Sequence, residues 1–164
     1  MTSPSQPSPS ADSDMPTRPD DAATGALFDA IATEHATIYG YGLVSAHSTP
    51  DVNYLVSAAM AEHRARREAA IALLVEQGVD APLPEAGYQL PMEVDTSVDA
   101  TNLAVGMEED AAVAWRAVVE QAGDHAVRAF GVTALTECAV TAAQWRSVRG
   151  DTAVTVAFPG GSEQ

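Results

Sequence analysis

Three ionisable residues lie where helices would bury them, and they are the residues best placed in this chain to do chemistry. Glu34, His63 and Glu108 each sit in the middle of a stripe of mostly apolar residues spaced three and four apart. Burying a carboxylate or a charged imidazole is costly unless it is paired or binds a metal ion. Carboxylate oxygens and imidazole nitrogens also suit iron, manganese or zinc. The pattern therefore indicates either a buried polar network or a metal site.

A basic run beside His63 supplies the opposite charge. Arg64, Arg66 and Arg67 follow His63 within about one and a half helical turns. Counted back from Leu74 in steps of three and four, the apolar stripe passes through Arg67 and then His63. A guanidinium keeps its proton in proteins, so it can balance buried carboxylates permanently. The spacing therefore predicts Arg67 as the arginine that faces the core.

Four long helices must position these residues. Apolar periodicity predicts them over residues 25–47, 50–77, 98–121 and 125–149. Thr49 and Asp124 are expected as N-caps, and Gly78 and Gly150 as C-caps. The first two helices are joined by a very short turn, and so are the last two. Each pair should therefore be antiparallel.

The connection between the second and third helices is of a different kind. Residues 78–97 contain three prolines and two glycines and read as an extended segment. A segment of this length can span up to about 65 Å, while a helix like 50–77 is about 40 Å long. It can therefore cross the whole bundle. The predicted fold class is all-α, a four-helix up-down bundle of ferritin-like topology with a long crossover between its second and third helices.

The chain outside residues 25–150 is expected to be less regular. Residues 1–24 are rich in Ser, Pro and Asp without apolar periodicity, and are predicted to form a disordered tail. Residues 151–164 are predicted to form an extended C-terminal tail, the first part of which packs on the bundle. A short strand there would have no obvious partner.

Composition narrows the classes of partner. The net charge is −15 and every basic residue is an arginine, so nucleic acid and anionic membrane surfaces are unfavourable partners. The single cysteine, Cys138, cannot form an internal disulfide, and its place on the apolar stripe of helix 125–149 favours an inert core thiol. No stretch reads as long and apolar enough to span a bilayer. We expect a cytoplasmic protein.

Several motifs together resemble an actinobacterial ferritin-like domain family of unknown function. The resemblance covers roughly residues 25–160. Its motifs are Glu34-His35, Tyr39-Gly40-Tyr41-Gly42, His63-Arg64-Ala65-Arg66-Arg67, Tyr88, Pro91, Trp115, Trp145 and the closing Phe158-Pro159-Gly160. The resemblance implies the fold and no established activity.

The chain departs from the di-iron members of the ferritin-like superfamily. In those proteins two helices each supply a Glu, as Glu34 and Glu108 would, and the other two each supply Glu-x-x-His. That spacing is absent here: Glu62 directly precedes His63, and Glu137 has Val140 where a histidine would be needed. If a metal ion is present, its ligands are expected to come from Glu34, Glu62, His63 and Glu108, with His35 as a further candidate.

Two hypotheses follow. In the first, Glu34, His35, His63, Arg67 and Glu108 form a buried polar network without metal or other cofactor. The chain is then a non-catalytic binding or assembly module, expected to be a homodimer, whose ligand is a small molecule or a protein. In the second, the chain is an iron- or manganese-binding relative of ferritin that acts as an oxidoreductase or stores metal.

Overall fold

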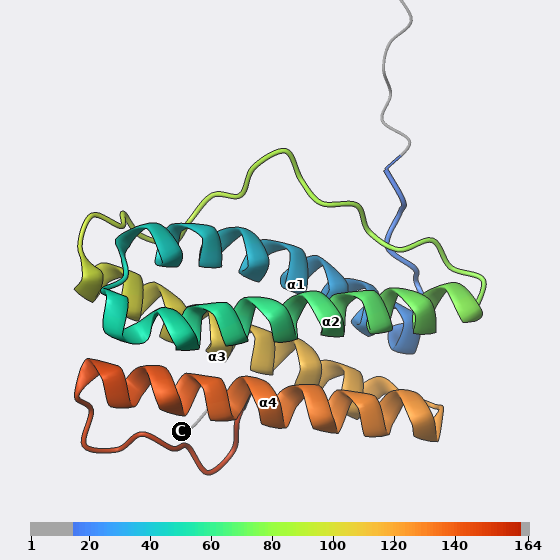
Figure 1. Ribbon diagram of the computed structural model, residues 1–164. Helices are drawn as coiled ribbons and strands as arrows, with labels where there is room; N and C mark the ends of the chain where they lie inside the picture. The colour runs from blue at the N-terminus through green and yellow to red at the C-terminus, as the bar shows by residue number, and fades with distance from the viewer. Residues whose placement is uncertain (1–14, 162–164) are drawn as a thin grey trace, which may run out of the picture.

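The computed structural model describes residues 15–161 and is built from four long helices lying side by side (Figure 1). They are α1 (Ala22–His47), α2 (Asn53–Glu76), α3 (Ser97–Gln121) and α4 (His125–Arg149), with a short 3-10 helix, η1 (Pro50–Val52), before α2. Residues 15–161 contain no strand. The predicted all-helical class is therefore confirmed for this part of the chain.

The connections follow the predicted lengths. A short connection that contains η1 joins α1 to α2, and residues 122–124 join α3 to α4. The crossover that follows α2 runs the length of the bundle over α1 before it enters α3 (Figure 1). It is held there partly by Tyr88, whose ring centroid lies 5.3 Å from that of Tyr39 on α1.

Helix α4 has both of its predicted caps. The Asp124 carboxylate accepts hydrogen bonds from the backbone N–H groups of Ala126 and Val127, and Gly150 ends α4 with a φ of 87°. The C-cap of α2 is Gln77 and not the predicted Gly78, which follows it with a φ of 75°. Asp21 caps α1 from outside the predicted range, so this helix begins three residues earlier than expected.

Thr49 does not cap a long helix, as the sequence predicted. Its side chain makes no capping hydrogen bond, and it precedes η1 rather than α2. Pro50 fits the first position of either kind of helix, because its missing N–H is not needed there. The proline signal therefore locates a helix start correctly without distinguishing a tight turn from a long helix.

Two apolar clusters occupy opposite ends of the bundle. One contains Leu27, Leu74 and Trp115 among its buried residues, and the other contains Leu55 and Leu103 among its own. On α1, α2 and α3, the residues of the two clusters lie on either side of Glu34, His63 and Glu108. The polar residues therefore lie between two hydrophobic half-cores.

A glycine allows α1 and α3 to approach closely. A Cβ atom at Gly40 would collide with the side chain of Met107 on α3, whereas one at Gly42 would meet open space. Of these two glycines, only Gly40 therefore lies in close contact with a neighbouring helix. The N-terminal flank is also fixed: the Arg18 guanidinium pairs with Asp29 on α1 at 2.8 Å.

The C-terminal segment turns back along the bundle after α4 (Figure 1). Arg146 donates a hydrogen bond of 3.1 Å to the carbonyl oxygen of Val154, and Gly160 lies directly against the backbone of Ala112 on α3. Contact therefore continues to residue 160, beyond the first part of the tail. The predicted disordered tail was residues 1–24: residues 1–14 lie outside the described residues, and residues 22–24 belong to α1.

One helix contradicts the expectation that no segment could span a bilayer. By length and composition alone α4 is apolar enough to do so, with a mean hydropathy of 1.2 in its most apolar window. A core helix of a soluble protein can meet the same criteria, so this is weak evidence for a membrane. The buried residues of α4, Trp145 and Cys138 among them, belong to the bundle core.

Candidate functional site

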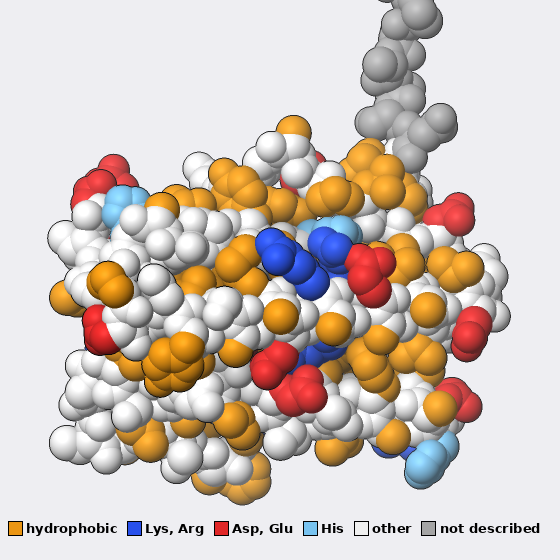
Figure 2. All heavy atoms as spheres, viewed as in Figure 1, with side chains coloured by type: hydrophobic (Ala, Val, Ile, Leu, Met, Phe, Trp, Pro, Cys, Tyr) orange, Lys and Arg blue, Asp and Glu red, His pale blue; other side chains and the backbone are white. Residues whose placement is uncertain are grey.

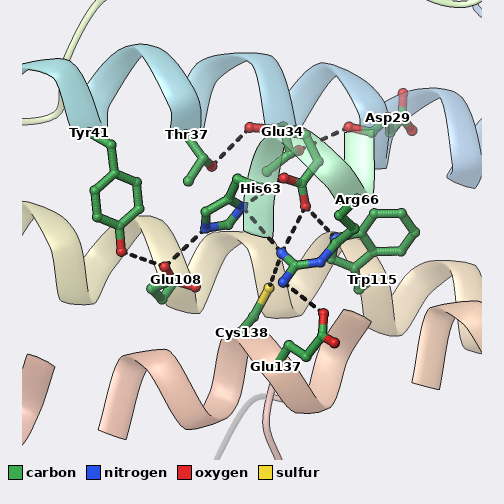
Figure 3. Close-up of polar contacts among 11 residues, drawn as sticks. Asp29, Glu34, Thr37, Tyr41, His63, Arg66, Glu108, Trp115, Glu137 and Cys138 are labelled. Carbon is green, nitrogen blue, oxygen red and sulfur yellow. Dashed lines mark hydrogen bonds and ion pairs between the residues drawn. The ribbon is translucent and has the colours of Figure 1, made fainter. Parts of the chain in front are cut away.

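His63 lies between two carboxylates at the centre of the bundle (Figure 3). Its Nδ1 is 2.6 Å from Oε2 of Glu34 on α1, and its Nε2 is 3.0 Å from Oε1 of Glu108 on α3. All three side chains are almost completely removed from solvent. The helical stripes therefore brought together the three residues that the sequence singled out.

Arg66, and not Arg67, completes this cluster. Its Nη1 donates to Oε1 of Glu34 at 3.2 Å, and its Nη2 donates to Oε2 of Glu137 on α4 at 3.0 Å. Arg67 is instead partly exposed and pairs with its neighbour Glu68. The predicted role of Arg67 is wrong, and the charge-balancing arginine is Arg66.

The helical period alone does not decide between the two arginines. Steps of three and then four residues connect His63 to Arg66 and Ala70, and steps of four and then three connect it to Arg67 and Ala70. Contacts with the neighbouring helix α4 decide which arginine faces the core. Nη1 of Arg66 donates a hydrogen bond of 3.2 Å to Sγ of Cys138 on α4.

Three aromatic donors surround the carboxylates. The indole N–H of Trp115 donates to Oε1 of Glu34 at 2.7 Å, and the hydroxyl of Tyr41 donates to Oε1 of Glu108 at 2.5 Å. Trp145 in turn donates its indole N–H to the Tyr41 oxygen at 2.9 Å. A buried tryptophan or tyrosine normally finds such a partner, and this was the available sequence signal for these residues.

The geometry makes His63 an imidazolium. Each ring nitrogen faces a carboxylate oxygen, which can only accept, so both nitrogens must carry a proton. Burial disfavours this charge, but hydrogen bonds and charges of Glu108 and Glu34 outweigh it and raise the pKa of His63 to about 9. Nδ1 also lies 3.2 Å from Nη1 of Arg66, and because both are donors, Glu34 must bridge them.

The pKa values of the partners agree with this charge state. Burial opposes ionisation of Glu34, yet the hydrogen bond and charge of His63, together with Arg66 and Trp115, hold its pKa below the ordinary value. Burial and the charge of Glu108 raise the pKa of Tyr41 well above its usual range, so its hydroxyl remains a donor. Two carboxylates thus face one imidazolium and one guanidinium.

Two buried atoms of the cluster have no hydrogen-bond partner among the described residues. They are Oε2 of Glu108 and Nε of Arg66. An unsatisfied buried polar atom is costly, and it often marks a place where water or a ligand binds. Glu108 therefore retains acceptor capacity that the protein itself does not use.

The remaining predicted site residues lie outside the cluster. His35 is buried, but its Nε2 faces the carbonyl oxygen of Pro82 in the crossover at 3.2 Å, and burial lowers its pKa. Glu62 is exposed. Adjacent residues on a helix point about 100° apart, so His35 and Glu62 point in other directions than Glu34 and His63. His35 is therefore not part of the network as predicted, and Glu62, which was predicted only as a ligand of a metal ion, is exposed.

The comparisons with known proteins identify the family. The profile of the family described as a domain of unknown function (DUF4439) matches residues 26–163. The chain belongs to the DUF4439 family. No curated protein matches it. It is similar to a solved structure, that of the conserved hypothetical protein rv2844 from Mycobacterium tuberculosis. The two are 55% identical, with a TM-score of 0.77, and the match covers 79% of this chain and 98% of that one.

The arrangement in this DUF4439 chain does not fit a di-metal centre. A metal ion needs a neutral imidazole lone pair and free carboxylate oxygens, but both nitrogens of His63 donate to Glu34 and Glu108. Arg66 adds a fixed positive charge beside Glu34. Within residues 15–161, no group of three or more His, Cys, Asp or Glu side chains has a geometry suited to a metal ion.

Proposed function

We propose that this DUF4439 chain is a ferritin-like helical bundle that acts as a non-catalytic binding or assembly module. In this proposal the Glu34–His63–Glu108–Arg66 cluster stands where ferritin-like di-iron proteins hold their metal. The observation that carries it is the position of His63, whose two ring nitrogens each face a buried carboxylate. The helix order and the long crossover support the ferritin-like assignment.

The protonation states support a structural role for the cluster. Two positive groups face two buried carboxylates, so the buried part of the cluster is neutral without an added ion, while Arg66 also pairs with the half-exposed Glu137. A buried ion network of this kind can fix the register of packed helices, because a shifted helix would leave its charges unpaired. Glu34, His63 and Glu108 are each at most 1% exposed, so a substrate has no direct access to them.

Metal analysis of the full chain, purified without added iron, tests this proposal. We expect far less than one iron or manganese per chain, and little change in melting temperature when either ion is added, because an ion that bound the native state would stabilise it. Stoichiometric iron or manganese in the wild-type protein would contradict the proposal and favour the alternative, a metal-dependent oxidoreductase or storage protein.

A variant of Arg66 sharpens the same test. Arg66→Met removes the guanidinium beside Glu34 and keeps much of the apolar length of the side chain. We expect it to lower stability by about 3 kcal/mol, because it leaves a buried carboxylate with one cation fewer, and to raise rather than lower metal binding. Arg64→Met, at an exposed position on the same helix, is the matched control. Equal metal content in both variants would argue against a charge-balancing role for Arg66.

The remaining parts of the proposal concern context. We propose a cytoplasmic homodimer that binds a small molecule or a protein and neither nucleic acid nor membrane. The net charge of −15 supports the exclusion of polyanionic partners. We further propose an actinobacterial source, for which the similarity to the mycobacterial protein gives support.

A further inference from the structure

A groove lies on the outer face of α4, between that helix and the C-terminal segment that runs back beside it (Figure 1). Its volume is about 510 Å³. Thr136, Val140 and Ala143 of α4 line one wall, and Val156 and Pro159 of the segment line the other. Two separate parts of the chain therefore form one concave surface, and Val140 is 53% exposed within it.

The groove is uncharged, although the protein is strongly acidic. None of the described residues that line it carries a charge, and most of them are apolar. The chain has a net charge of −15, so two copies repel each other unless they meet at a face without charge. Contiguous apolar surface that is open to water also favours association. The groove is therefore a place where a second, equally acidic copy can approach.

A large apolar side chain lies beside the groove. Phe158 is 69% exposed, although it belongs to the closing motif of the C-terminal segment. Its ring borders the cavity on the other side of that segment, toward α3, so it does not fill the groove of its own chain. Phe158 directly precedes Pro159, which lines the groove. The exposed ring and the uncharged groove are therefore neighbours on the surface.

The segment that carries Phe158 is held on both sides of this residue. Before it, the Val154 carbonyl oxygen accepts a hydrogen bond of 3.1 Å from Arg146. After it, Gly160 lies against the backbone of Ala112 with a φ of 71°, where a Cβ atom would collide. A side chain on a backbone that is already fixed loses less conformational freedom on binding than one on a free end. Phe158 is therefore presented to a partner at a defined place.

Two identical chains can use an exposed ring and a groove of this kind together. In a dimer with a two-fold axis the same surface meets itself, so a contact between the ring of one copy and the groove of the other occurs twice. This requires that ring and groove are neighbours on one face and that the ring does not occupy its own groove. Phe158 and the groove beside Pro159 meet both conditions.

From these observations we infer that a second copy of this chain occupies the groove, and that each copy inserts Phe158 into the groove of the other. The inference deepens the proposed homodimer and rests on it, since it names the surface and the residue through which the two copies join. Aromatic side chains bury a large apolar area and dominate the energetics of many interfaces. Phe158 should therefore contribute a large share of the dimer's stability.

Sedimentation velocity of the full-length protein over a range of concentrations tests this inference. We expect a dimer for the wild type. Phe158→Ala should weaken it by about a hundredfold, because about tenfold is lost at each of two identical contacts. Tyr54→Ala removes another ring, 71% exposed near the start of α2, and is the matched control that should leave the affinity unchanged. Unchanged dimer affinity in Phe158→Ala, or an equal loss in Tyr54→Ala, would overturn the inference.

A pair of complementary variants separates insertion of the ring from general apolar attraction. Ala143→Phe fills the groove from its own wall and should also weaken the dimer. A mixture of Ala143→Phe and Phe158→Ala should form a heterodimer that is tighter than the dimer of either variant alone. In that pair the intact Phe158 of one chain meets the open groove of the other, and the filled groove faces an alanine. Ser147→Phe, at an exposed groove position, repeats the experiment if Ala143→Phe does not fold. A mixture with no more dimer than the separate variants would contradict the insertion.

Failure of this inference is distinguishable from failure of the proposed function. A wild-type dimer that does not depend on Phe158 would contradict the inference alone and leave the homodimer standing. A wild type that remains a single chain at every concentration would contradict both. Single chains that sediment with neutral phosphatidylcholine vesicles would assign the apolar face to a membrane instead. The metal content of the protein is independent of all these results.

Discussion

At the scale of single residues, the charge of His63 determines the balance at the centre of this DUF4439 chain. The imidazolium donates to Glu34 and Glu108, and Arg66 provides the second positive charge. A neutral imidazole can donate from only one nitrogen, so one of the two carboxylates would then face a lone pair. The protonation of one buried ring is therefore coupled to the stability of the bundle.

This coupling predicts a loss of stability at alkaline pH. The pKa of His63 is raised from an ordinary value of 6.5 to about 9, so its contribution is complete below pH 6.5 and is lost as the pH rises through 9. The free energy of unfolding should fall by roughly 3 kcal/mol across this window. Chemical denaturation at pH 6.5, 7.5 and 9 measures it.

The control for this experiment is a second histidine. His125→Gln changes an exposed ring at the start of α4 and should leave the pH dependence unchanged. The thiol of Cys138, whose pKa burial raises, ionises in the unfolded chain near the upper end of this window and adds a smaller loss of stability in the same direction. A stability that is flat or increases between pH 6.5 and 9 would exclude an imidazolium in the folded state.

The sequence could predict which residues are buried more easily than which partners they find. Glu34, His63 and Glu108 were found because each lies on the apolar stripe of its own helix. Arg66 was missed because a helical stripe is about as wide as the angle between neighbouring residues, and contacts across to α4 chose between Arg66 and Arg67. The spacing of apolar residues along one helix carries no information about the helix that packs against it.

At the scale of elements, the C-terminal segment and α3 meet at Gly160. The φ of 71° and the contact with the Ala112 carbonyl both exclude a side chain there. We expect Gly160→Ala to detach the segment at a cost of about 1–2 kcal/mol. Hydrogen exchange of the backbone amides of residues 152–161 should show this as lost protection. Gly87→Ala, where a Cβ atom meets open space at ordinary φ, is the control. Unchanged exchange in Gly160→Ala would show that the contact does not hold the segment.

The long helices were predictable and their exact starts were not. An apolar period that repeats over more than twenty residues predicts a helix even where single residues are ambiguous. A glycine at a helix end directly indicates a left-handed backbone conformation. The start of α2 depends on whether three residues after Thr49 form a 3-10 or an α-helical turn, and Pro50 suits both. The path of the C-terminal segment depends on contacts with α3 that no local pattern encodes.

At the scale of the whole molecule, we expect the proposed homodimer to have its interface on the outer face of α4. Thr136, Val140, Ala143 and Ser147 follow one another at helical spacing, and none is charged. They line a groove of about 510 Å³ together with the C-terminal segment. The lower left of Figure 2, over the C-terminal half of α4, accordingly shows hydrophobic and uncharged side chains. In a chain of net charge −15, an uncharged face is where a second copy meets least repulsion.

Light scattering after size-exclusion chromatography tests the homodimer proposed on this basis. We expect twice the chain mass of 17.0 kDa for the wild type, and the mass of one chain for Val140→Glu, which places a charge on the face. Val75→Glu introduces the same charge at an exposed position near the end of α2 and should remain dimeric. A monomeric wild type, or a dimer that survives Val140→Glu, would rule out α4 as the interface.

The charge balance of the polar layer between the two apolar half-cores depends on the protonation of His63, which can be measured. Nitrogen-15 NMR of the histidine rings at pH 7.5 distinguishes an imidazolium from either neutral tautomer. The structure predicts that both Nδ1 and Nε2 of His63 carry protons at this pH, since its pKa is about 9. A neutral ring at pH 7.5, with one nitrogen lone pair free beside Glu34 or Glu108, would contradict the charge-balanced centre.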